Sequence, residues 1–415
     1  MSFNPVKAFN YLKELSYSRF AGSPGEISAR DYIKRRFEEF GYHPILEDFD
    51  IKTYNILKSK IEIIEPYFGE IPCFGLGFSG STPDEGIEDI LVYVENADKI
   101  LLPSDEGFIY LMSARPNFST WKFLTKKKKP SAILIAESNP YRDLSHVAIP
   151  YEWRKFGTIP SLYIKFDEAV RIVRSGVNKV RVILVQEIKD TKSYNIIAEK
   201  RGYKYPDEII VVGGHYDTVY GVPGSFDNAG GTAFVLELAR VFSKMKTKRT
   251  LLFILFAGEE MGLRGSRAYL EQHKEDIENI KLMVNLDVHG ACIGTTSSII
   301  TGFADLKNYV EALTKEYGIK MNVREDIMSS DGTSFAKYGV PAVNFFRSSG
   351  AGSDMHTIYD NERYMGITGY KLLGIIVQKF IEKVANAEEL PFKREIPENL
   401  KKKVKEYFSE RLGID

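Results

Sequence analysis

From about residue 193 onward, continuous apolar runs alternate with stretches of helical periodicity. EIIVVGGH, TLLFILFAGEE and KLMVNLDVHG each contain an apolar run of the kind that forms strands buried on both faces. AGGTAFVLELARVFSKM and YKLLGIIVQKFIEKVANAEE have the length and the periodicity of helices. This alternation predicts an α/β fold in which helices cover both faces of a sheet.

The pattern is different before this point. Residues 1 to about 50 predict two helices and a strand, and short β-rich pieces such as DILVYVEN and SAILIAE then dominate as far as about residue 190. We therefore expect a discontinuous catalytic domain, residues 1–53 and 193–415, that is interrupted by a β-rich inserted domain, residues 54–192.

Composition excludes several classes of partner. Lysine plus arginine and aspartate plus glutamate are both 56, so no net charge draws the chain to nucleic acid or to an anionic membrane. The run from Lys126 to Lys129 is expected to be a solvated loop. Cys73 and Cys292 form no disulfide framework. Since the N-terminus has no signal-peptide pattern and the apolar runs are too short to span a bilayer, we expect a cytoplasmic protein.

Side chains that can bind metal ions follow the ends of the predicted strands. The five expected ligands are His215, Asp227, Glu260, Asp287 and His356. Nitrogen and carboxylate ligands without thiolate suit zinc or a similar divalent ion in a catalytic site. Five ligands are too many for one tetrahedral site with an open position. The sequence therefore predicts two metal ions that share a bridging carboxylate.

The neighbours of these ligands predict individual roles. Asp227 lies in a long glycine-rich loop that allows close approach to a buried centre, and its two oxygens could each bind one metal. Adjacent residues of an extended chain face opposite ways, so we assign Glu260 as a ligand and Glu259 as the general base. Asp217 follows His215 by two residues and is expected to hold its second ring nitrogen.

The ordered motifs of the second half resemble those of a known family. GGHYD, SFDNAGG, FAGEEMGLRGSRAYL, VNLDVHG, SSDGTSFAKYGVPAVNF and MHTIYD resemble the motifs of the dizinc aminopeptidases of metallopeptidase family 28, over residues 193–385. TIPSLYIKFDEAVRIVRSG is similar to the protease-associated domain that some members insert. The resemblance implies a three-layer α/β/α zinc-exopeptidase fold with a mixed central sheet.

The resemblance also implies how the ligands are shared. Each metal ion would take three side chains with one in common: His215, Asp227 and Asp287 for one, and Asp227, Glu260 and His356 for the other. Glu259 would be the base, and Asp217 would orient His215. The bridging loop departs from the family, because SFDN replaces the acidic pair that usually precedes the asparagine. Asp227 is then the sole candidate bridge.

These features together predict an aminopeptidase that hydrolyses the N-terminal peptide bond with a water activated by two metal ions. We expect zinc, although cobalt and manganese suit the same ligands. The partner is a peptide with a free N-terminus, because surplus negative charge at the site favours its ammonium group.

Two alternatives remain open. One is a carboxypeptidase-like enzyme or another amide hydrolase on the same fold. The carboxypeptidase could use Arg347, near His356, to hold a carboxylate, although a surface role suits this arginine as well. A non-enzymatic relative would lose ligands or the base, and the chain keeps both.

Overall fold

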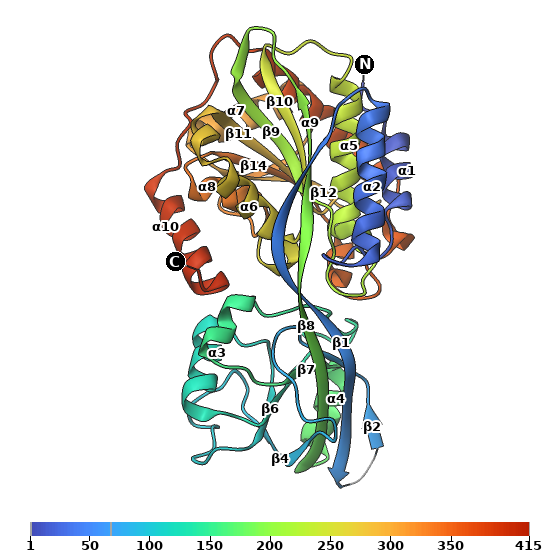
Figure 1. The fold of residues 1–415 in the computed structure, drawn as a ribbon, viewed down its shortest axis with the longest axis vertical. Helices are drawn as coiled ribbons and strands as arrows, with labels where there is room; N and C mark the ends of the chain where they lie inside the picture. Colours follow the sequence, from blue (N-terminus) through green and yellow to red (C-terminus); the bar gives the residue numbers. More distant parts are fainter. Residues whose placement is uncertain (1, 67–68, 415) are drawn as a thin grey trace. The chain divides into compact units, whose positions relative to one another are not determined.

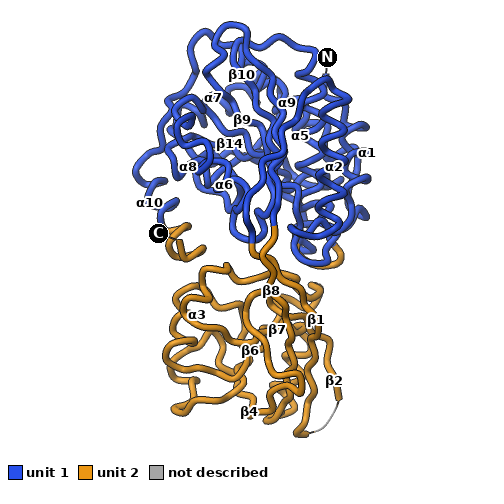
Figure 2. The backbone as a smooth tube through the Cα atoms, viewed as in Figure 1, with its two compact units in different colours: residues 1–51, 192–355, 360–405 blue, residues 52–191, 356–359, 406–415 orange. Residues whose placement is uncertain are grey.

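The computed structural model of the chain describes residues 2–66 and 69–414, which form two compact units (Figure 2). Unit 1 comprises the chain up to residue 51 together with 192–355 and 360–405. Unit 2 comprises 52–191, 356–359 and the residues from 406 onward. The C-terminal residues thus group with unit 2, whereas we expected them in the catalytic domain. The expected domain boundaries themselves stay a prediction.

A mixed sheet forms the centre of unit 1 (Figure 1), and its strand order is β13-β12-β14-β11-β9-β10-β8. The strands are β8 (Lys179–Lys200), β9 (Tyr205–His215), β10 (Arg249–Phe256), β11 (Ile280–Leu286), β12 (Thr295–Thr301), β13 (Asn322–Glu325) and β14 (Ala342–Ser348). β9 pairs in parallel with β10 and β11, whereas β8 and β10 are antiparallel, as are β12 and β14. The predicted α/β fold with a mixed central sheet is confirmed.

Helices cover this sheet on both faces (Figure 1). They are α1 (Pro5–Glu14), α2 (Pro24–Glu39), α5 (Gly230–Phe242), α6 (Arg264–Gln272), α7 (Ala304–Glu316), α8 (Gly332–Lys337) and α9 (Thr368–Asn386). A further helix, α10 (Glu398–Glu406), follows α9 along the chain. Successive strand residues point to opposite faces. Phe253 of β10 accordingly contacts Phe242 of α5, while Ile254 shares a buried cluster with Phe335 of α8.

Local sequence explains where the second helix begins and ends. The Ser23 side chain accepts a hydrogen bond from the Glu26 N–H, and Pro24 occupies the first turn, where a missing N–H costs nothing. Gly41 follows the helix at a φ of +92°, a backbone conformation that favours glycine. The residues at its two ends therefore account for where this helix starts and stops.

The order of the parallel strands brings the candidate motifs to one edge of the sheet. β11, β9 and β10 are neighbours, so their carboxyl ends lie side by side. His215 is the last residue of β9, and Asp287 directly follows β11. Glu259 opens the turn that follows β10. Ligand types that are far apart in the sequence thus meet at one place in the fold.

None of the described helices in either unit is long and apolar enough to cross a bilayer. Unit 2 is built mainly from strands. Its elements are β1 (Ile45–Glu65, which begins in unit 1), β2 (Gly69–Ile71), β3 (Cys73–Gly75), β4 (Ile87–Tyr93), β5 (Ile109–Met112), β6 (Ala132–Ala136), β7 (Ser161–Ile164), the first half of β8, α3 (Phe118–Phe123) and α4 (Phe166–Arg174). The lysine run that we expected in a loop is mostly helical instead, because Leu124–Lys128 continue α3 as a π-helical turn.

Candidate metal centre

His215 lies among three carboxylates at the carboxyl end of β9. Its Nε2 is 3.1 Å from Oδ1 of Asp227 and 3.4 Å from Oδ1 of Asp287. All three side chains are buried, and their potential ligand atoms lie within 4.8 Å of one another. Burial opposes protonation of the imidazole, but the surrounding carboxylates outweigh it and raise the pKa of His215 well above its usual value. This position therefore attracts positive charge.

A second group of potential ligands contains Asp227, Glu260 and His356, whose ligand atoms also lie within 4.8 Å of one another. His356 belongs to the four-residue segment 356–359, which groups with unit 2. The residues on either side of that segment, Met355 and Asp360, belong to unit 1. Asp227 is common to both groups, as a bridging carboxylate would be.

Asp217 connects the histidine to the turn that follows β10. Its Oδ1 lies 3.4 Å from Nδ1 of His215 and accepts a hydrogen bond from the Glu259 N–H at 3.1 Å. Its Oδ2 accepts one from the Glu260 N–H at 3.3 Å. One buried carboxylate thus fixes both the imidazole ring and the backbone of the Glu259–Glu260 pair.

Glu259 is partly buried in a turn of Glu259–Met261. Gly258 precedes the turn at a φ of +66°, where a Cβ would lie 2.7 Å from the Ile51 side chain, so glycine is required. Burial raises the pKa of Glu259 well above its usual value, and the charges of Glu260 and Asp331 add to the effect, while His215 opposes it. A carboxyl group of high proton affinity suits a general base.

The residues present fit divalent metal ions. Ligand atoms about 2.1 Å from a common tetrahedral ion lie about 3.4 Å apart, close to the separations around His215. Oδ1 of Asp287 is buried without a hydrogen bond, a costly state that an ion would relieve. Nitrogen and carboxylate donors are those that zinc prefers in catalytic sites.

The structure adds three residues that our sequence analysis missed. Asn228 donates hydrogen bonds to the carbonyls of His215 (3.2 Å) and Leu286 (3.0 Å), so it ties together the ends of β9 and β11. Asp360 accepts the N–H groups of Phe226 and Asp227, and Asp331 is a buried carboxyl whose pKa burial raises to about 7. All three belong to recognised motifs, but only the fold shows their partners.

Two other sequence-based assignments change. Arg347 is buried rather than on the surface, and its guanidinium donates hydrogen bonds to the carbonyls of Ala291 and Cys292. It is therefore engaged with backbone. His289, whose position two residues after Asp287 in the sequence also suggests support of a ligand, packs against Phe234 with 4.8 Å between ring centroids, and burial lowers its pKa to about 3. It is a neutral packing residue.

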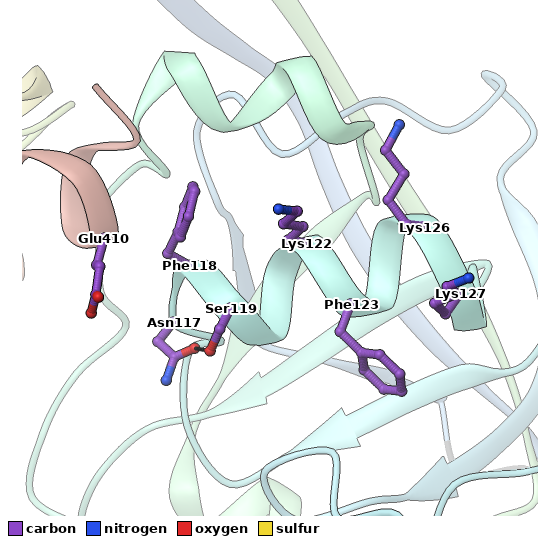
Figure 3. A pocket seen from close by; sticks show the side chains of 8 residues that line it. All are labelled: Asn117, Phe118, Ser119, Lys122, Phe123, Lys126, Lys127 and Glu410. Carbon is purple, nitrogen blue, oxygen red and sulfur yellow. Dashed lines mark hydrogen bonds between the residues drawn. The ribbon is translucent and has the colours of Figure 1, made fainter. Parts of the chain in front are cut away.

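A separate hollow of about 770 Å³ lies within unit 2, along α3 and the lysine run. Its lining includes Phe118, Lys122, Phe123 and Glu410. Figure 3 shows that these side chains do not converge, because Phe118 and Lys122 lie on one side of the helix and Phe123 on the other. The hollow has no arrangement that would hold one ligand.

Part of the chain matches a known family model. Residues 195–381 match the model described as peptidase family M28, which confirms the resemblance found in the motifs. Carboxypeptidase Q of Xenopus laevis is 24% identical over 290 residues, 65% of this chain and 62% of that protein. Aminopeptidase YwaD of Bacillus subtilis is 26% identical over 264 residues, 61% of this chain and 57% of that protein. The chain thus matches less than two thirds of the length of these curated relatives.

Solved structures share the whole fold. An aminopeptidase from Aneurinibacillus sp. strain AM-1 is 25% identical, with a TM-score of 0.73 over 94% of this chain and 95% of that one. A peptidase M28 precursor from Shewanella amazonensis SB2B is 20% identical, with a TM-score of 0.82 over 94% of this chain and 96% of that one. At that identity the second structure speaks for the fold alone.

Proposed function

We propose that this chain, a member of peptidase family M28 through residues 195–381, is an aminopeptidase that binds two divalent metal ions. The observation that carries the proposal is the convergence of two ligand groups on one shared carboxylate, Asp227. A structural site would be closed by four ligands around one ion, whereas three ligands per ion leave positions for water and substrate.

Each residue of the centre has a distinct task in this proposal. His215 and Asp287 would hold one ion, Glu260 and His356 the other, with Asp227 between them. Asp217 would keep the His215 ring in the tautomer that exposes Nε2 to the ion. We take the ions to be zinc, and cobalt and manganese as substitutes that the same donors accept.

Bound ions of this kind supply Lewis acidity and lower the pKa of a water from roughly 16 to about 7. Glu259 would accept the proton that the attacking water loses, and it would deliver that proton to the departing amine. The turn that follows β10 holds this carboxylate beside the ligand Glu260 without requiring it to bind metal. A positioned base of this type contributes about 10²–10⁴-fold to the rate.

Charge at the centre supports the choice of a free amino terminus. Five carboxylates gather at the centre, so that two divalent ions would still leave a negative surplus: Asp217, Asp227, Glu259, Glu260 and Asp287. A substrate ammonium is attracted to such a surplus, whereas a substrate carboxylate requires a cation. Arg347, the cation considered for that purpose, is bound to backbone carbonyls. The same surplus would repel the C-terminus of a peptide.

The test is a set of three forms of one peptide, with both termini free, with the N-terminus acetylated, or with the C-terminus amidated. Cleavage is followed in the presence of zinc, cobalt or manganese. We expect the free and the amidated peptides to lose their first residue, and the acetylated peptide to remain intact. The Glu259→Gln protein, purified identically, controls for a contaminating peptidase.

The alternatives give different results. A carboxypeptidase, as the frog relative is named, would cleave the acetylated peptide and spare the amidated one. An endopeptidase would cleave all three forms. Either result would replace our assignment, and the absence of cleavage with all three metals would favour a non-enzymatic relative.

A further inference from the structure

Arg19 is a buried cation that no step of the proposed reaction uses. It lies between α1 and α2, its exposed fraction is 0%, and burial lowers its pKa to about 10, which leaves it charged near neutral pH. Burying a charge is costly unless every donor finds an acceptor. Its partners are therefore informative.

Those partners are backbone carbonyls at both ends of the loop between His215 and Asp227, residues 216–226, which we call the metal loop. Nε donates to the carbonyl of Tyr216 at 2.7 Å. Nη1 donates to Pro223 at 2.8 Å and Nη2 to Gly224 at 3.0 Å. One planar guanidinium thus joins the residue that follows one ligand to residues just before the bridge.

The other nitrogen contacts of Arg19 anchor it to the N-terminal segment. Nη1 also donates to the carbonyls of Leu15 and Tyr17, and the Arg19 N–H donates to Oγ1 of Thr218 in the metal loop. The metal loop is therefore fastened to a part of the chain about two hundred residues away.

Asp360, a carboxylate, holds the end of the metal loop through backbone N–H groups, whereas the Arg19 cation holds backbone carbonyls. Its Oδ1 accepts the N–H of Phe226 at 2.7 Å, and its Oδ2 accepts the N–H of Asp227 at 3.1 Å. Its own carbonyl accepts the N–H of Ser225 at 3.2 Å. A cation thus binds the loop's carbonyls, and an anion binds its amides.

We propose that Arg19 and Asp360 form a clamp that presets the metal loop, so that Asp227 is held in its bridging position before metal binds. The inference rests on the proposed metal centre. Without a clamp, the charges of Asp217, Asp227 and Asp287 would repel one another and open the loop. Holding ligands in place before binding lowers the ordering cost that each ion must meet. Both residues act through backbone and are positioning residues.

The clamp is tested by conservative variants on each side of it. Arg19→Lys keeps the charge but has three donors in place of a fork of five. Asp360→Asn keeps the shape but turns one acceptor into a donor that faces an N–H. Replacing a side chain that orients a metal ligand typically lowers metal affinity by 10–100-fold. We expect each variant to bind Zn²⁺ at least tenfold more weakly than wild type. Affinity is measured by competition with a chromophoric chelator, at a temperature where circular dichroism shows that the variant is folded.

Arg394 offers a matched control. Its guanidinium also binds two backbone carbonyls, of Ile280 and Ile277, but at the amino end of β11 rather than at the metal end. Arg394→Lys should lower the melting temperature of the metal-free protein and leave Zn²⁺ affinity within twofold of wild type. A second readout is the visible absorption of the Co²⁺-loaded protein, which should shift in Arg19→Lys and not in Arg394→Lys.

The outcomes are distinct. If Arg19→Lys and Asp360→Asn bind Zn²⁺ within threefold of wild type, or if Arg394→Lys loses as much affinity, the clamp is wrong and the metal centre stands. If wild type itself binds no Zn²⁺, the proposed function fails together with the clamp. Should Arg19→Lys not fold, Asp360→Asn decides alone, because it tests the same loop from its other end.

Discussion

Replacing Asp217 by asparagine should weaken metal binding while it leaves all five ligands in place. The carboxylate accepts two N–H groups, from Glu259 at 3.1 Å and from Glu260 at 3.3 Å, and faces Nδ1 of His215 at 3.4 Å. An asparagine has one acceptor oxygen and one NH₂ group. Whichever way its amide turns, NH₂ meets a backbone donor, and one partly buried N–H loses its partner.

The size of the effect follows from these contacts. A buried donor without a partner costs about 1–3 kcal/mol. Loss of the charge that orients a metal-binding histidine typically lowers affinity by 10–100-fold, which is about 1.4–2.7 kcal/mol. The metal-free protein also loses one of several crowded negative charges, which stabilises it. Metal affinity is therefore a cleaner quantity than the melting temperature.

The assay is Zn²⁺ affinity by chelator competition, followed by kcat/KM at saturating zinc. We expect Asp217→Asn to bind zinc 10–100-fold more weakly. We also expect a lower kcat, because the turn that carries Glu259 keeps only one of its two hydrogen bonds to residue 217. Asp190→Asn, which removes the same charge from an exposed pair with Lys52, should change neither quantity. Zinc affinity and kcat both within twofold of wild type in Asp217→Asn would refute this reasoning.

Two further changes have predictable results. Glu259→Gln should retain its metal and lose about 10²–10⁴-fold in kcat; metal analysis that finds the zinc lost instead would show that Glu259 and Glu260 have exchanged roles. Glu26 is buried, and burial is the main cause that raises its pKa from 4.5 to about 7. Its contribution to the free energy of unfolding is therefore present in full below pH 4.5 and is lost as the pH rises through 7. Between pH 4.5 and 8, urea unfolding of the metal-free wild type should therefore lose up to about 3 kcal/mol relative to Glu26→Gln, and parallel pH profiles would show that Glu26 keeps an ordinary pKa.

Much of unit 1 could be predicted because its local signals are strong. Short apolar runs that end in glycines, such as the one before His215, are typical of buried strands, and parallel neighbours place their carboxyl ends together. That rule brought His215, Glu260 and Asp287 to one edge of the sheet, whereas the division of the ligands into two groups came from the resemblance to the family. The same rule explains why Glu259 and Asp287, from different strands, lie near one histidine.

The rest depended on partners that no local pattern reveals. Arg19 and Asp360 are ordinary charged residues in the sequence, and their roles come from backbone groups far along the chain. Arg347 has the same character, so its burial could not be predicted. β8 extends over Lys179–Lys200 although its middle is polar, because each half pairs with different strands. Such features arise from tertiary packing rather than from propensity.

The central claim is that one chain holds two metal ions through the shared carboxylate of Asp227. The direct measurement is to strip the protein with a chelator, titrate it with Zn²⁺ by equilibrium dialysis, and count bound zinc by mass spectrometry in wild type and in Asp227→Ala. We predict two ions per wild-type chain, with peptide cleavage restored as they bind, and neither full occupancy nor activity in Asp227→Ala. One ion or fewer per chain at saturating zinc, or full activity in Asp227→Ala, would contradict the account.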